Sequence, residues 1–168
     1  EETAMDLDSL FGLPAHPLVV HGAVVLLPLA AAGTIVIAAV PRARRHFAPL
    51  VLAVSLVATV AVGLAQTSGE ALEDQVRETD LVEQHTEQGE SVLPWAVAVT
   101  VTAAAVTAAS RLDRRERPHV RPKLMATVLI AVALATGIGA TWSVVDVGHS
   151  GAKATWTTVQ DADSGDDD

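Results

Sequence analysis

Histidines are the side chains best suited to chemistry in this 168-residue chain, which contains six of them and no cysteine. Two of them, His16 and His21, lie at the start of a long apolar run, where a buried imidazole needs a partner. Neutral imidazole binds zinc, copper and iron, and two imidazoles can hold the iron of a haem b. Because the chain has no cysteine, it offers no thiolate metal site and no attachment point for covalent haem.

Four uncharged runs must position these histidines. Each run is about 20 residues or longer, which is the length that crosses the hydrocarbon core of a bilayer as a helix. A soluble bundle is the alternative, but soluble helices need a polar face, and these runs have almost none. The sequence therefore predicts an all-α fold, a four-helix transmembrane bundle. The predicted spans are residues 17–40, 48–66, 92–110 and 123–147.

The charges predict how the bundle is oriented. Nine of the eleven Lys and Arg residues lie between the first and second runs or between the third and fourth. Cytoplasmic loops carry such an excess of positive charge. We therefore expect a multi-pass protein of a bacterial cell membrane, in contact with the lipid bilayer, with basic loops cytoplasmic and both termini external. The net charge of −9 then belongs to an acidic outer face and does not indicate a nucleic-acid partner.

The segments outside the spans divide the chain further. Residues 1–15 form the predicted external N-terminus, 16–149 the membrane domain, and 150–168 an acidic external tail that we expect to be largely disordered. The external segment 67–91 has apolar residues at helical spacing, which predicts a short amphipathic helix between spans two and three. The residues on this stripe are Leu72, Val76, Thr79, Val82 and His85.

This topology places four of the six histidines at the outer face: His16, His21, His85 and His149. The other two, His46 and His119, fall in the basic loops and are interpreted as solvated. We predict His21 and His85 as the preferred cofactor ligands, with His16 as the third candidate. His16 and His21 lie about 140° apart on an ideal helix, so they share a metal only if His16 precedes the helix.

A metal ion other than haem iron would need two or three of these histidines together with a carboxylate. The candidate metal ligands are His16, His21, His85, His149, Glu70 and Glu73, with Glu78 as a further carboxylate. The alternative interpretation is that the histidines form hydrogen bonds between helices and bind no cofactor.

Three stretches of the sequence resemble the DUF2231 family of small predicted bacterial membrane proteins with about four spans. GLPAHPLVVHGAVVLLPLA (12–30) is similar to its His-Pro-x-x-Val-His opening, and HTEQGE (85–90) to its His-x-x-x-Gly-Glu element. VGHSGAKATW (147–156) is similar to its closing Gly-x-x-Gly-Ala stretch, although the family does not always have histidine at the position of His149. The resemblance implies no established activity, but its histidines and its association with redox proteins imply a haem or metal site.

Two functions follow as hypotheses. The first is a membrane protein that binds haem b or a divalent transition metal at its outer face, for electron transfer or as a subunit of a redox complex. The second is a cofactor-free accessory or assembly subunit of a larger, respiratory-type membrane complex, with other membrane subunits or further copies of itself as partners. A transporter is disfavoured, because no charged residue lies in the central part of any span.

Overall fold

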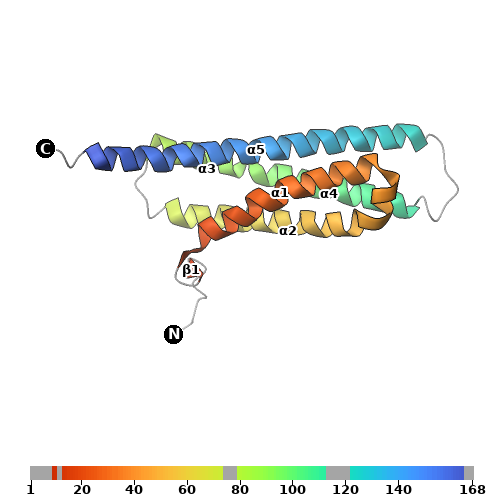
Figure 1. The fold of residues 1–168 in the computed structure, drawn as a ribbon, viewed down its shortest axis with the longest axis horizontal. Helices are drawn as coiled ribbons and strands as arrows, with labels where there is room; N and C mark the ends of the chain where they lie inside the picture. The colour runs from red at the N-terminus through yellow and green to blue at the C-terminus, as the bar shows by residue number, and fades with distance from the viewer. Residues whose placement is uncertain (1–8, 11–12, 74–78, 113–121, 165–168) are drawn as a thin grey trace.

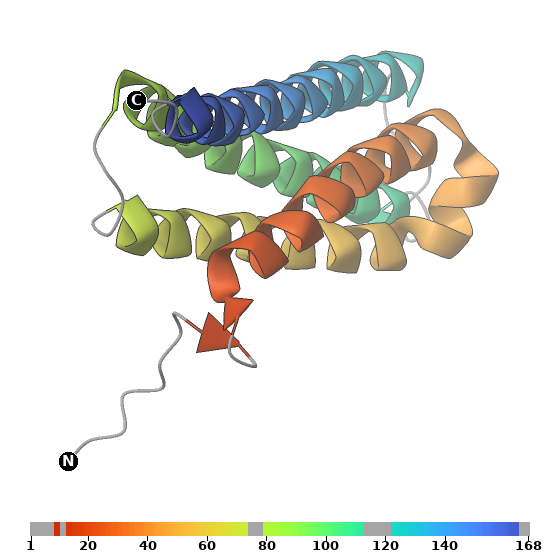
Figure 2. The same ribbon diagram turned by 60° about the vertical axis from the view of Figure 1, so that its left-hand side comes forward.

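The computed structural model of the chain describes residues 9–10, 13–73, 79–112 and 122–164, and these form a bundle of long helices (Figures 1 and 2). The elements in order are β1 (Ser9–Leu10), β2 (Leu13–Pro14), α1 (Ala15–Ala39), α2 (Pro41–Glu73), α3 (Asp80–Glu90), α4 (Val92–Leu112) and α5 (Pro122–Ser164). The two short strands pair in antiparallel fashion just before α1. The predicted all-α, four-helix bundle is confirmed.

Proline residues set the limits of the first two helices. Pro17 lies in the first turn of α1, where its missing N–H is not needed by the helix. Pro41 opens α2 in the same way, and it disfavours helical geometry for the preceding residue, so α1 ends at Ala39. Pro28 lies inside α1 and removes one backbone hydrogen bond from its middle.

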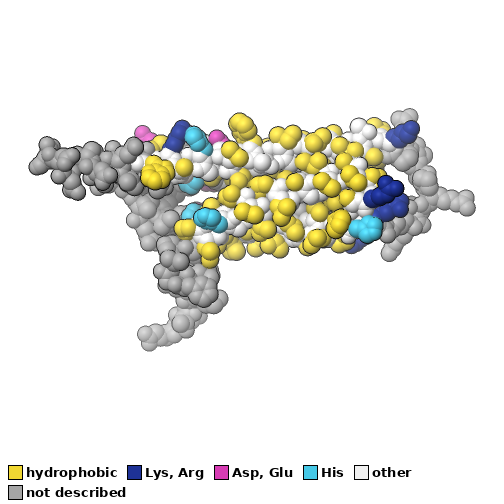
Figure 3. Space-filling model, in the orientation of Figure 1, with side chains coloured by type: hydrophobic (Ala, Val, Ile, Leu, Met, Phe, Trp, Pro, Cys, Tyr) yellow, Lys and Arg dark blue, Asp and Glu magenta, His cyan; other side chains and the backbone are white. Residues whose placement is uncertain are grey.

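Small residues fill the bundle interior, whereas large apolar residues cover its outside. Ala58, Ala96, Ala103 and Ala140 are fully buried in the core, together with a few larger side chains such as Leu27. Many large apolar side chains are instead exposed, among them Val25, Val60, Val101, Ile138 and Val145. Figure 3 shows this apolar surface along the length of the bundle. Small residues let membrane helices approach closely, and the apolar exterior suits contact with lipid.

Four segments are long and apolar enough to cross a membrane: His16–Ala39, Pro41–Glu70, Asp80–Leu112 and Lys123–Lys153. They correspond to the four predicted spans. The third includes α3, which is separated from α4 only by the turn at Ser91. The short helix α3 therefore joins the start of the third segment, and the amphipathic helix on an outer surface between spans two and three stays a prediction.

Hydroxyl groups join α2 to α4 inside the bundle. Thr59 Oγ1 donates its one proton to Thr100 Oγ1, at 2.8 Å, and lies 3.2 Å from the carbonyl oxygen of Ala96 on α4. Thr100 Oγ1 donates across to the carbonyl of Ser55 on α2, at 3.0 Å. Polar contacts of this kind hold helices together where the hydrophobic effect contributes little.

Two helices run beyond the ends expected from the sequence. Helix α2 continues past residue 66 to Glu73, and α5 continues past residue 147 to Ser164. The continuation of α5 packs against α3, so tertiary contact extends the helix through Gly148 and Gly151. The part of the predicted disordered tail at 165–168 lies outside the described residues.

The two ends of the bundle differ in their side chains. At one end, called here the histidine end, α1 begins, α2 ends and α3 packs on α5. At the other, called the basic end, lie Arg42, Arg44, Arg111 and Lys123 at helix termini. Figure 3 shows histidine side chains gathered at the first end and a basic cluster at the second.

Candidate functional site

His16 lies in the first turn of α1, and its ring is held by the C-terminal part of α2. Its Nδ1 atom lies 3.1 Å from the carbonyl oxygen of Ala65 and 3.1 Å from Ser68 Oγ. A carbonyl oxygen only accepts hydrogen bonds, so Nδ1 carries the proton of the neutral ring. The other nitrogen, Nε2, therefore carries a lone pair and is able to bind a metal.

His85, on α3, is held in the same way by α5. Its Nδ1 atom lies 3.1 Å from Ser150 Oγ, and that hydroxyl lies 3.0 Å from the carbonyl of Val147, one turn earlier in α5. When the hydroxyl donates its one proton to the carbonyl, it accepts from Nδ1–H of His85. In that tautomer the Nε2 atom of His85 also carries a lone pair.

A glycine follows each of these serines and makes room for the imidazole. A Cβ atom added at Gly69 would lie 3.1 Å from Cε1 of His16, and one added at Gly151 would lie 2.8 Å from Cε1 of His85. Contacts this short require the neighbouring ring to move. Each histidine thus lies against helix backbone, with a serine at Nδ1 and a glycine beside Cε1. We call these two sets, His16 with Ser68 and Gly69 and His85 with Ser150 and Gly151, the His–Ser–Gly clusters.

The two clusters are neighbours at the histidine end. The imidazoles of His16 and His85 are close enough to interact electrostatically, and both rings are partly buried. A hydrogen bond of 2.9 Å from Gln66 Nε2 to the carbonyl of Gly89 ties α2 to α3 beside them. The bundle therefore brings together two imidazoles, one from each half of the chain, at the histidine end.

A family model described as a predicted membrane protein, DUF2231, matches residues 12–162. The chain belongs to the DUF2231 family. The match includes every residue of both His–Ser–Gly clusters. Searches of curated proteins and of solved structures found no match.

In this DUF2231 protein the remaining candidate ligands whose side chains are described, His21, His149 and Glu70, are exposed. The Nδ1 atom of His21 is hydrogen-bonded to the carbonyl of Pro17 in its own helix. The side chain of Glu73 and the whole of Glu78 lie outside the described residues. Within the described part of the chain, no three His, Asp or Glu residues form a group that could hold a metal ion.

Sequence reasoning missed the serine and glycine of each cluster. The dipeptide Ser-Gly occurs at Ser68-Gly69, Ser150-Gly151 and Ser164-Gly165, and nothing in the sequence pairs the first with His16 or the second with His85. The partner is supplied from 52 residues away in one case and 65 in the other.

Proposed function

We propose that this DUF2231 protein binds a b-type haem between His16 and His85, at the histidine end of its membrane domain, for one-electron transfer. The observation that supports this most is the hydrogen bonding of the two rings, each of which is held through its Nδ1 atom. In His16, Nδ1–H is donated to a carbonyl and Nε2 keeps a lone pair, and the bond between Nδ1 of His85 and Ser150 Oγ allows the same tautomer. Histidine ligands of metals commonly donate the other ring N–H in this way, which fixes the tautomer and the ring orientation.

Haem suits this pair better than a bare metal ion does. A protein-bound zinc ion usually takes three or four protein ligands, whereas haem iron needs one or two axial ligands, because the macrocycle supplies the other four. The described residues offer two imidazoles and no group of three ligands. An iron held by two imidazoles in a haem exchanges one electron between its ferric and ferrous forms. The protein's own part is to hold both rings in the ligating tautomer and to shield them partly from water.

A buried acceptor beside the pair also supports a bound group at this end. Gln88 lies one turn after His85 on α3, and its Oε1 atom is buried without a hydrogen-bond partner among the described residues. A buried polar atom left without a partner costs about 1–3 kcal/mol. We expect a bound ligand or an ordered water molecule to supply the missing donor.

The visible spectrum of the detergent-purified protein tests this proposal. We expect a reduced haem band after addition of dithionite in the wild type, and its loss in both His16→Ala and His85→Ala. His46→Ala is the matched control, because His46 lies at the basic end and is bonded to the carbonyl of Arg42 in its own helix. This variant should keep the full spectrum.

Two results would contradict the proposal. A wild-type protein that takes up no haem during expression or in titration would favour the accessory-subunit hypothesis. A haem spectrum that is lost in His21→Ala and retained in His16→Ala would identify His21, and not His16, as the histidine that binds the iron.

A further inference from the structure

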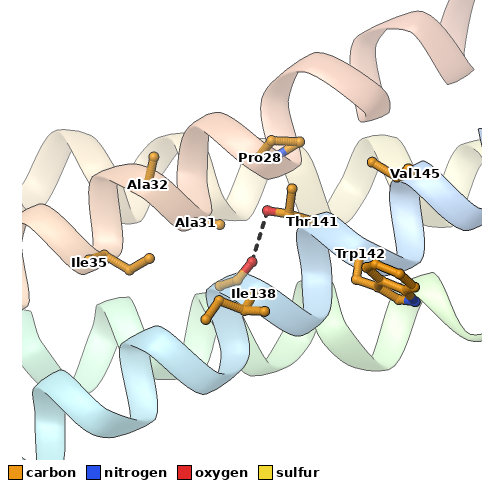
Figure 4. A pocket seen from close by; sticks show the side chains of 9 residues that line it. Pro28, Ala31, Ala32, Ile35, Ile138, Thr141, Trp142 and Val145 are labelled. Atoms are coloured by element: carbon orange, nitrogen blue, oxygen red, sulfur yellow. Dashed lines mark hydrogen bonds between the residues drawn. The ribbon is translucent and has the colours of Figure 1, made fainter.

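The long sides of the bundle offer a lipid mostly apolar contacts. A groove of about 470 Å³ between α1 and α5 is an example (Figure 4). Pro28 and Ile35 line it from α1 and Ile138 from α5. The hydroxyl of Thr141 in its lining is already bonded to the carbonyl of Gly137. Such contacts do not distinguish one lipid from another, so recognition of a head group must come from the ends of the bundle.

The basic end carries positive charge without matching carboxylates. Nine Lys and Arg residues lie at 42–45 and 111–123, against two acidic residues, Asp113 and Glu116, which is an excess of seven positive charges. Those two acidic residues lie outside the described part of the chain, where every Asp and Glu falls within 70–90 or 146–163, nearer the histidine end. This excess of positive charge attracts anions.

The packing of α2 on α4 brings two of the arginines together. The hydroxyl of Thr107 on α4 lies 3.4 Å from the carbonyl oxygen of Ala48 on α2, and both residues are buried. The two helices run in opposite directions (Figure 1). One turn beyond this contact, toward the basic end, come Arg44 on α2 and Arg111 on α4. The two arginines therefore occupy neighbouring positions on helix faces that pack against each other.

Neither of these arginines has a carboxylate partner among the described residues. Arg44 is also partly buried, whereas Arg42, two positions earlier, is exposed. A guanidinium group that loses water without gaining an anion is destabilised, and two such groups side by side repel each other. Guanidinium groups bind phosphate oxygens through two parallel hydrogen bonds. The pair therefore has the chemistry of a phosphate site.

Apolar side chains border the pair on the membrane side. Phe47 follows Arg44 by three residues, so it lies on the same face of α2 one turn nearer the middle of the bundle. Phe47 is 55% exposed, and Leu50, a further three residues along, is 60% exposed. A soluble anion or an acidic protein uses only the arginines. A phospholipid uses both features, because its phosphate reaches the arginines while its acyl chains lie along the apolar side chains.

We propose that Arg44 and Arg111 together bind the phosphate of an anionic phospholipid, with its acyl chains along the exposed apolar side chains of α2. The excess of positive charge at this end favours a lipid with net negative charge over a zwitterionic one, because the ammonium group of the latter is repelled. The site lies at the opposite end from the His16–His85 pair and does not depend on haem.

Equilibrium binding of phosphatidylglycerol, labelled on an acyl chain, to the immobilised protein in detergent micelles tests the pair. The salt concentration is about 0.5 M, where the Debye length is about 4 Å and diffuse attraction is screened. We expect Arg44→Gln and Arg111→Gln each to weaken binding about tenfold, because each removes charge-assisted hydrogen bonds. Arg44→Lys should weaken it as well, since an ammonium group does not reproduce the two parallel bonds.

Arg42→Gln is the matched control. It removes the same charge from the same end of α2, but residues two apart do not share a helix face, so its affinity should stay within about twofold of the wild type. An equal loss of affinity in Arg42→Gln, or unchanged binding in both Arg44→Gln and Arg111→Gln, would overturn the paired site.

Two competition experiments identify the occupant. Unlabelled phosphatidylglycerol should displace the labelled lipid, whereas phosphatidylcholine should do so at least about tenfold less well; equal displacement would overturn the preference for an anionic lipid. Inorganic phosphate and polyglutamate should have little effect. Displacement by either as effective as that by phosphatidylglycerol would overturn the lipid in favour of a free phosphate or an acidic protein.

Discussion

In each His–Ser–Gly cluster, the serine hydroxyl is placed to accept a hydrogen bond from Nδ1 of the histidine. The two serines differ in how much the orientation and tautomer of their histidine depend on them. His85 donates to Ser150 alone among the described contacts of its Nδ1 atom, whereas His16 donates to the Ala65 carbonyl as well as to Ser68. A backbone carbonyl remains after any side-chain substitution. The His85 tautomer therefore depends on one hydroxyl, and the His16 tautomer does not.

This difference predicts unequal effects of two matched substitutions. Ser150→Ala should weaken haem affinity about 10- to 100-fold, which is the usual cost of losing such a supporting partner of a metal ligand. Ser68→Ala should weaken it much less, because the bond to the Ala65 carbonyl persists. Haem titration of the apoprotein followed by absorbance measures both. Equal losses in the two variants would contradict the assignment of Nδ1–H in His16.

Substitution of the cluster glycine at position 151 tests whether His85 lies against α5. Gly151→Ala should destabilise the protein by about 1–3 kcal/mol, because the added methyl would lie 2.8 Å from Cε1 of His85 and the ring must move. Gly63→Ala is the control, since a Cβ there meets nothing within 4 Å and helix propensity favours alanine. Thermal unfolding in detergent measures the difference. A Gly151→Ala protein as stable as the wild type would show that His85 is not held against α5.

Among the elements, the spans were predictable from the sequence and their ends were not. An uncharged run of about 20 residues specifies a membrane helix by its length and composition. Nothing local keeps α5 helical beyond Gly148, because that requires α3 to pack against the continuation of α5. The same limit applies to the site: His16 could be recognised as a candidate from its position, but Ser68 becomes its partner only through the packing of α1 on α2.

The hydrogen bonds of the threonine hydroxyls between α2 and α4 are expected to stabilise the bundle. Thr100→Val removes the bond to the Ser55 carbonyl and the contact with Thr59, and should destabilise the bundle by about 0.6–1.7 kcal/mol. Thr127→Val is the matched control, because Thr127 is exposed and its hydroxyl bonds only within α5, to the Lys123 carbonyl. Comparison of the melting temperatures in detergent tests this. Equal melting temperatures for the two variants would show that the hydrogen bonds between α2 and α4 do not stabilise the bundle.

For the whole molecule, the position of the basic end predicts the orientation in the membrane. Positive loops remain in the cytoplasm, so the histidine end should face outward. The chain has no cysteine, so single cysteines can be introduced without background labelling. We expect a membrane-impermeant maleimide to label His149→Cys in intact cells, and His46→Cys only after the cells are made permeable. The reverse pattern would place the candidate site in the cytoplasm.

The arrangement of each His–Ser–Gly cluster also sets an order of assembly during synthesis. Each histidine comes early in its half of the chain, and its Ser-Gly partner comes at the end of that half. Protein chains emerge from the ribosome starting at the N-terminus. The first cluster can therefore close once residue 69 has emerged, while the second waits for residue 151. A nascent chain that stalls before its last helix carries a single fixed imidazole, so a ligand that requires both can bind only when synthesis is nearly complete.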